Sequence, residues 1–138
     1  MIHFVGIDVE VPSRLGHLNK RWIDSIVEKF GKKTGEVFFL FCSDNYLLGM
    51  NQTFLDHDTF TDIITFDLSE FDDFLSGELY ISLERVIENA EYQNINFIDE
   101  LDRVMIHGVL HLLGFNDKTG EEQYEMRKQE DICLSLRT

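Results

Sequence analysis

Residues 101–113 constrain the fold of this chain more than any other stretch, because they are almost continuously apolar and yet contain two histidines. An apolar run of this length is typical of a helix that is buried on most of its sides. His107 and His111 are four residues apart, which on a helix is one turn plus about 40°, so both side chains project from the same face. The chain is therefore expected to pack around this helix.

The residues that follow the two histidines predict a metal site. Two imidazoles one helical turn apart can bind one metal ion. Gly114 permits the backbone turn that ends a helix, and Asp117 follows three residues later. The pattern H-x-x-x-H-x-x-G-x-x-D is similar to that of zinc proteases, except that Gly108 replaces their catalytic glutamate. We therefore predict His107, His111 and Asp117 as metal ligands; the alternative is a pair of structural core histidines.

Length and composition indicate one globular domain spanning residues 1–138, with 43% hydrophobic residues including twelve phenylalanines. No apolar run reaches the roughly 18 residues that a membrane span needs, and the first residues lack a signal-peptide pattern. A cytoplasmic protein is therefore expected. Cys42 and Cys133 lie in apolar surroundings and are expected to be buried and free.

The net charge of −14 argues against general binding to nucleic acid, because contact with phosphates needs lysine and arginine. Six of the twelve cations nevertheless fall within residues 14–33, beside only two acidic residues. This basic segment could attract an RNA backbone, or it could be the solvated face of a helix. Charge alone leaves both interpretations open.

The hydrophobic periodicity predicts an α+β fold in which about five helices flank a small, mixed, four-stranded sheet. Strands are expected near residues 2–9, 37–42, 63–66 and 77–81, and a polar loop at residues 56–62. The helices have recognisable starts. The expected N-terminal caps are Ser13, Ser43 or Asp44, Ser82, and Thr119 in a capping box with Glu122.

Nearly end to end, the chain resembles the YbeY family of metal-dependent endoribonucleases, whose metal helix is similar to that of zinc proteases. The resemblance rests on the HGVLHLLGFND stretch at residues 107–117 and on several supporting positions. These are Asn51, Asp58, Thr61, Asp62, Phe66, Gly77, Glu78, Glu122, Met126 and Glu130. The resemblance implies cleavage of single-stranded RNA, with roles in maturation of the 3′ end of small-subunit ribosomal RNA and in ribosome quality control. The implied partners are ribosomal RNA and the small subunit with its proteins, and no membrane.

The resemblance also implies one zinc ion per chain, or another divalent transition metal, bound by His107 and His111. The third ligand of the family is usually a histidine in the run G-Y-D-H, and Asp117 stands at that place here. A carboxylate is a competent zinc ligand. Its negative charge is expected to make a bound water less acidic and to relax the metal preference toward manganese or iron.

Two further positions depart from the family pattern. Leu55 occupies the place of an arginine that is thought to matter for RNA cleavage, and Arg103 stands where a histidine is common. One hypothesis is that Arg103, which precedes His107 by one helical turn, partly replaces the missing cation; Arg85 is a second candidate. The alternative for Arg103 is a salt bridge to a carboxylate such as Asp99, four residues earlier on the same helix.

The expected chemistry is metal-assisted hydrolysis of a phosphodiester. The identity of the general base is left open between two alternatives: the reaction needs no base, or a carboxylate of the loop at residues 58–62 assists. Thr61 and Asp62 could position the substrate or merely shape a turn. His57 is expected to be a solvated loop residue, and Glu122 and Glu130 are expected to serve the last helix rather than the metal.

Three other functions are weighed against the nuclease. The metal-ligand spacing suggests a metallopeptidase, but Gly108 argues against it. A non-catalytic ribosome-assembly factor with structural zinc is kept open by Leu55, although structural zinc normally has four protein ligands. A generic metal-binding interaction module is the third, and the near full-length resemblance argues against it.

Overall fold

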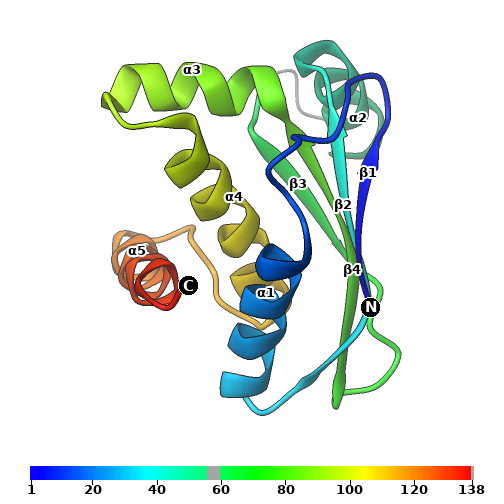
Figure 1. The fold of residues 1–138 in the computed structure, drawn as a ribbon, viewed down its shortest axis with the longest axis vertical. Helices are drawn as coiled ribbons and strands as arrows, with labels where there is room; N and C mark the ends of the chain where they lie inside the picture. The colour runs from blue at the N-terminus through cyan, green and yellow to red at the C-terminus, as the bar shows by residue number, and fades with distance from the viewer. Residues whose placement is uncertain (56–59, 138) are drawn as a thin grey trace.

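The sheet is mixed, as the sequence predicts, with the strand order β1-β2-β4-β3 (Figure 1). A computed structural model describes residues 1–55 and 60–137 of the chain. The strands are β1 (Ile2–Gly6), β2 (Lys33–Cys42), β3 (Ile63–Asp67) and β4 (Phe74–Ser82). β2 pairs in parallel with both β1 and β4, whereas β3 runs antiparallel to β4 along one edge. This arrangement confirms the α+β class.

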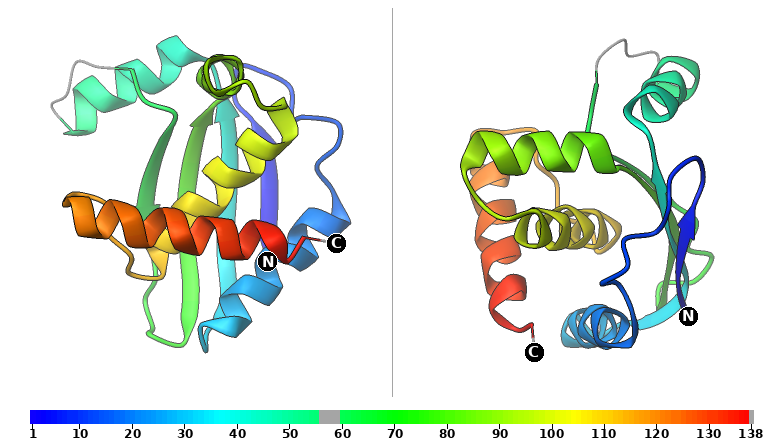
Figure 2. Two further views of the ribbon diagram at one scale, coloured as in Figure 1. Left: turned by 90° about the vertical axis from the view of Figure 1, so that its left-hand side faces the viewer. Right: turned by 45° about the horizontal axis from the view of Figure 1, so that its top comes forward.

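Helices cover one face of the sheet in two successive layers (Figure 2). The helices on this face are α1 (His17–Lys29), α3 (Leu83–Gln93), α4 (Phe97–Leu112) and α5 (Gly120–Ser135), whereas α2 (Asp44–Leu55) is not part of these layers. α4 lies against the sheet and α5 crosses α4 on the side away from the sheet, while α2 packs separately near one end of the strands. α4 is therefore covered on both sides, which explains why its sequence from Val104 on is apolar apart from the two histidines.

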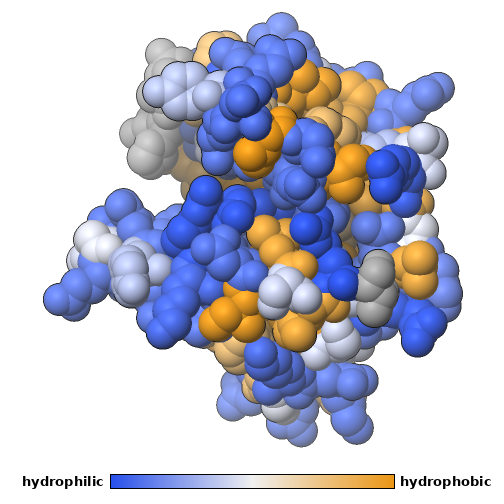
Figure 3. All heavy atoms as spheres, turned by 60° about the vertical axis from the view of Figure 1, so that its left-hand side comes forward, coloured by the Kyte–Doolittle hydropathy of each residue, from blue (hydrophilic) through white to orange (hydrophobic). Residues whose placement is uncertain are grey.

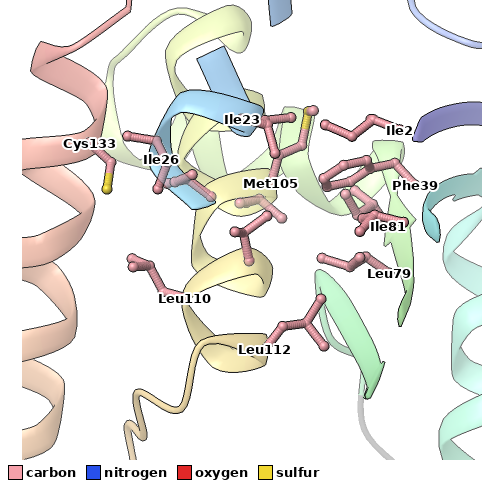
Figure 4. Packing of buried hydrophobic residues seen from close by; sticks show 14 of the residues in the cluster. Ile2, Ile23, Ile26, Phe39, Leu79, Ile81, Met105, Leu110, Leu112 and Cys133 are labelled. Atoms are coloured by element: carbon pink, nitrogen blue, oxygen red, sulfur yellow. The ribbon is translucent and has the colours of Figure 1, made fainter. Parts of the chain in front are cut away.

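The core forms where α1 and α4 meet the inner face of the sheet (Figure 4). Along β2 the side chains alternate, so that Phe39 and Phe41 are fully buried on this face while Phe38 and Leu40 are only half-buried on the other. Met105 of α4 is fully buried against this layer. Buried residues of α4 such as Met105 lie on the side of the helix that faces the strands, and their packing holds α4 in place on the sheet.

Three of the predicted helix caps are confirmed, and one is wrong. Ser43, Ser82 and Thr119 each accept a hydrogen bond from the backbone N–H three residues later, and Thr119 forms the expected capping box. The Ser13 cap is wrong, because α1 begins at His17 after an N-cap at Gly16. Ser13 instead lies in a turn that is closed by a hydrogen bond from Leu15 N–H to the carbonyl of Pro12.

The first strand is shorter than predicted, because the chain turns back on itself after Gly6. A Cβ at Gly6 would lie 2.2 Å from the carbonyl oxygen of Val9, a contact that only glycine permits.

The prediction for the cysteines is confirmed, since Cys42 and Cys133 are buried and free. Within the described residues, no helix has both the length and the apolar character that a membrane crossing requires.

Candidate metal centre

The two histidines project from the middle of α4, and the chain then turns to bring Asp117 back to them. Gly114 adopts a positive φ of 105° directly after the helix. The N–H of Gly114 donates to the carbonyl of His111, and the N–H of Phe115 donates to that of Leu110. This pair of bonds is the Schellman motif, which ends a helix and reverses the chain. The predicted role of Gly114 in the turn is confirmed.

The three predicted ligand atoms form a nearly equilateral triangle. Nε2 of His107 lies 3.0 Å from Nε2 of His111, and Oδ2 of Asp117 lies 3.2 Å from the first nitrogen and 3.3 Å from the second. A tetrahedral zinc ion with bonds of about 2.0–2.1 Å would hold its ligand atoms about 3.3 Å apart. The spacing and the donor set of two imidazoles and one carboxylate therefore fit such an ion.

Glu130 of α5 holds the first of these histidines, a role that the sequence interpretation missed. Its Oε2 lies 2.6 Å from Nδ1 of His107, so the expectation that Glu130 serves the last helix rather than the metal site is wrong. When Nδ1 of His107 donates this hydrogen bond, Nε2 is left unprotonated and faces the triangle. Carboxylates that orient histidine ligands in this way are a common feature of metal sites.

Arg103 in turn holds Glu130. Its guanidinium donates to Oε1 of Glu130 at 3.0 Å and to Oδ1 of Asp131 at 2.8 Å. The alternative reading of Arg103, a salt bridge to a carboxylate, is confirmed, but the partners are Glu130 and Asp131 of α5. The example given for it, Asp99, pairs instead with Arg137 at 3.0 Å. The second candidate cation, Arg85, binds Asp44 at 2.6 Å and lies at the start of α3.

A cleft with a volume of about 360 Å³ opens beside the triangle, and among its charged lining residues the carboxylates outnumber the arginines. The charged and ligand-type residues that line it are Asp62, Glu100, Arg103, His107, Asp117, Arg127 and Glu130. The cleft thus brings Asp62 and Arg103 together with the predicted ligands. Thr61 is not among the described residues that line the cleft. Figure 3 shows a mainly hydrophilic surface on the side of the molecule where α5 lies.

Burial and neighbouring charge compete at two titratable groups of this cleft. Burial raises the pKa of Asp62, although the positive field of His107 partly offsets it. Burial alone would lower the pKa of His107, but the hydrogen bond to Glu130 and the surrounding carboxylates outweigh it, so the pKa of His107 is raised. An acidic environment of this kind favours any cation between these groups, whether a proton or a metal ion.

Gly108 is a packing residue at the place where zinc proteases have their base. A Cβ built there would lie 2.3 Å from Cδ2 of Leu79 and 2.7 Å from Cδ1 of Ile63. Position 108 therefore faces the contact between α4 and the sheet, and a side chain there would not enter the cleft. This geometry agrees with the expectation that the site lacks the peptidase base.

Comparison with known proteins identifies the family. A family model described as "Endoribonuclease YbeY" matches residues 3–136. The chain belongs to the YbeY endoribonuclease family. Proteins named Endoribonuclease YbeY from Cytophaga hutchinsonii and Flavobacterium psychrophilum are 49% and 46% identical to it over 136 and 130 residues. These alignments cover 99% and 94% of this chain, and 95% and 91% of the two relatives.

The fold of this YbeY family member is also similar to a solved structure. The solution structure of a protein from Thermotoga maritima superimposes with a TM-score of 0.65 at 33% sequence identity. The match covers 97% of this chain and 89% of the other. The agreement extends the family likeness from the metal helix to the sheet and the surrounding helices.

Several positions of the YbeY resemblance lie away from the triangle or beyond what the structure describes. Asp58 and His57 fall outside the described residues. Leu55, at the end of α2, is exposed, and Asn51 is buried on the same helix. The basic segment at residues 14–33 contributes none of the described residues that line the cleft, so its interpretation as an RNA-binding surface stays a prediction.

Proposed function

We propose that this protein is a metal-dependent endoribonuclease that cleaves single-stranded RNA, with a role in ribosomal RNA processing. The observation that carries the proposal is the triangle of His107, His111 and Asp117 at an open cleft, in a chain of the YbeY family. The proposed substrates are maturing small-subunit ribosomal RNA at its 3′ end and the RNA of defective ribosomes. The small subunit and its proteins are the proposed partners, and the cytoplasm is the proposed compartment.

The metal that we propose is one zinc ion per chain. Two imidazoles and one carboxylate match a common ligand set of catalytic zinc sites, in which the fourth position stays open. When bound, a divalent ion supplies a Lewis acid that polarises a phosphoryl oxygen and makes a water molecule more acidic. The carboxylate of Asp117 adds one negative charge, which supports binding of manganese or iron as alternatives.

The other residues of the cleft are proposed to position the ligands and the substrate. Asp62 lies at the cleft and its buried carboxyl has a raised pKa, which suits a group that accepts a proton or orients a water. Thr61 precedes it and is proposed to help set its position. Arg103 is proposed to act through Glu130 on His107, because both of its ion pairs are made to carboxylates of α5.

Two observations weigh against the other functions. The packing of position 108 against Leu79 and Ile63 argues against a peptidase, because a side chain there would meet these two residues instead of entering the cleft. Three clustered ligand residues among those the structure describes argue against a structural zinc site, which normally has four. A non-catalytic assembly factor is supported only by Leu55 in the place of the arginine that the family usually carries.

Elemental analysis together with an RNA-cleavage assay tests the proposal. Wild-type protein purified without added metal is expected to contain about one zinc per chain, as a single three-ligand site implies. Asp117→Ala is expected to lose most of the zinc and to lose cleavage of a single-stranded RNA, while Lys128→Gln retains both. A wild-type protein that binds zinc but leaves RNA intact in the presence of small subunits would favour the assembly factor.

A further inference from the structure

The two arginines that line the metal cleft differ sharply in how far their charges are already used. Arg103 and Arg127 are the cations among the described residues that line this cleft. The side chain of Arg103 is 17% exposed, whereas that of Arg127 is 54% exposed. Only one of the two is therefore readily available to a ligand from solution.

Arg103 is committed to the protein itself. It binds Glu130 at 3.0 Å and Asp131 at 2.8 Å, so two negative charges surround its guanidinium. A phosphate could reach Arg103 only by displacing these carboxylates, and Glu130 would then lose the group that holds it against His107. Arg103 is thus poorly suited to replace the arginine that Leu55 has displaced.

Arg127 lies on α5, three residues before Glu130, and is held far more loosely than Arg103. Its ion pair within the described chain is a contact of 3.6 Å from Nη1 to Oε1 of Glu130, an oxygen that Arg103 already occupies. Charge-assisted hydrogen bonds are shorter, at about 2.7–2.9 Å. Within the described residues, the donors of the Arg127 guanidinium therefore remain available to a ligand. Glu130 contacts both Arg127 and His107, so Arg127 lies close to the metal triangle.

The negative charge of the cleft explains why a further cation would be needed to bind RNA. Four carboxylates line the cleft, namely those of Asp62, Glu100, Asp117 and Glu130. Such a surface repels the phosphates of RNA unless cations offset it. A divalent ion on the triangle offsets part of this charge, and an exposed arginine on the rim is the group that would meet a further phosphate oxygen with a bidentate contact.

We propose that Arg127 is a phosphate-binding residue for the single-stranded RNA substrate. The inference rests on the proposed function for its substrate class. It differs from the hypothesis for Arg103, which here positions Glu130.

RNA binding by the zinc-loaded full chain tests the proposal. The probe is a fluorescent single-stranded oligouridine of about ten nucleotides, bound on ice over a series of salt concentrations and checked on a gel for intactness. Arg127→Gln is expected to weaken binding about tenfold and to reduce the slope of log K against log salt by about 0.7, the loss of one phosphate contact. Lys128→Gln makes the same charge change at the next exposed residue. Its RNA affinity is expected to stay within about twofold of that of wild type, and its salt slope is expected to be unchanged.

The possible outcomes separate this inference from the proposed function. Equal losses in Arg127→Gln and Lys128→Gln, or an unchanged slope in Arg127→Gln, would overturn the assignment even if wild type cleaves RNA. If wild type binds the oligonucleotide through Arg127 and never cleaves RNA, the nuclease proposal fails and the phosphate site stands. Absence of binding by wild type overturns both. Zinc content and circular dichroism are expected to be unchanged in both variants, because both side chains are exposed.

Discussion

Glu130 and His107 come from different helices, 23 residues apart in the chain, and their side chains meet at 2.6 Å. This contact fixes which nitrogen of His107 faces the metal triangle, because the other nitrogen donates to the carboxylate. Glu130 is itself nearly fully buried and is held by Arg103. The arrangement therefore transmits the packing of α5 against α4 to the geometry of the metal ligands.

Glu130→Gln is expected to weaken zinc binding about 10–100-fold, because loss of an orienting carboxylate lowers the basicity and the order of a histidine ligand. Competition with a chromophoric chelator measures this affinity directly. Glu121→Gln, an equal charge change at an exposed position of α5, serves as the control. Identical affinities in the two variants would show that Glu130 does not act on the metal site.

Asp117→His is expected to retain about one zinc per chain, since imidazole and carboxylate are both regular zinc ligands. Asp117 is the most exposed of the three ligands, with a side chain 38% exposed, so its loop can accommodate the larger ring. Elemental analysis beside Asp117→Ala tests this. Retention of zinc by the alanine variant as well would remove Asp117 from the ligand set.

Gly108→Ala is expected to destabilise the protein by about 1–2 kcal/mol, because the new methyl group would overpack the buried contact with Leu79 and Ile63. Gly49→Ala, in the middle of α2 where nothing lies within 4 Å of the added Cβ, is expected to stabilise by up to about 1 kcal/mol. Urea unfolding followed by circular dichroism compares the two. A stabilising effect at both positions would mean that α4 does not approach the sheet this closely.

The metal-free protein is expected to lose stability as the pH rises through the pKa of Glu100. Burial raises this pKa from its ordinary value of 4.5, with the hydrogen bond from Gln93 only partly offsetting the effect. The folded state therefore binds the proton more tightly than the unfolded state, and its extra stability is complete below the ordinary pKa and lost above the raised one.

Urea midpoints measured between about pH 4 and pH 8 test this dependence. Glu100→Gln keeps the acceptor for Gln93 and is expected to lose less stability than wild type as the pH rises, whereas Glu121→Gln at the surface is expected to follow wild type. A Glu100→Gln curve with the same slope as wild type would contradict the raised pKa of Glu100.

Several features of the fold and site follow from spacing along the chain alone. The four-residue separation of His107 and His111 on an apolar helix fixes their common face, and Gly114 fixes the turn that returns Asp117. The caps at Ser82 and Thr119 are equally local, because they bind N–H groups only three residues away. Ser13 misleads because a serine before an apolar repeat can lie in a turn as well as at a helix start.

Other features depend on how distant segments pack, and spacing within the chain does not encode them. Periodicity cannot tell that the turn of α5 carrying Glu130 faces His107, or that Arg103 is bound by α5 while Arg127 stays open to solvent. Nor can it tell that Gly108 faces the sheet, where an added Cβ would lie within 3 Å of Leu79 and Ile63.

The metal helix, the three candidate ligands and the mixed α+β class are predictable from local patterns, because helix geometry and apolar periodicity act over a few residues. The carboxylate that orients His107 and the arginine that remains available to a substrate are not predictable in this way. Those outcomes are set by the crossing of α4 and α5, where ion pairs form between side chains that the chain order keeps far apart.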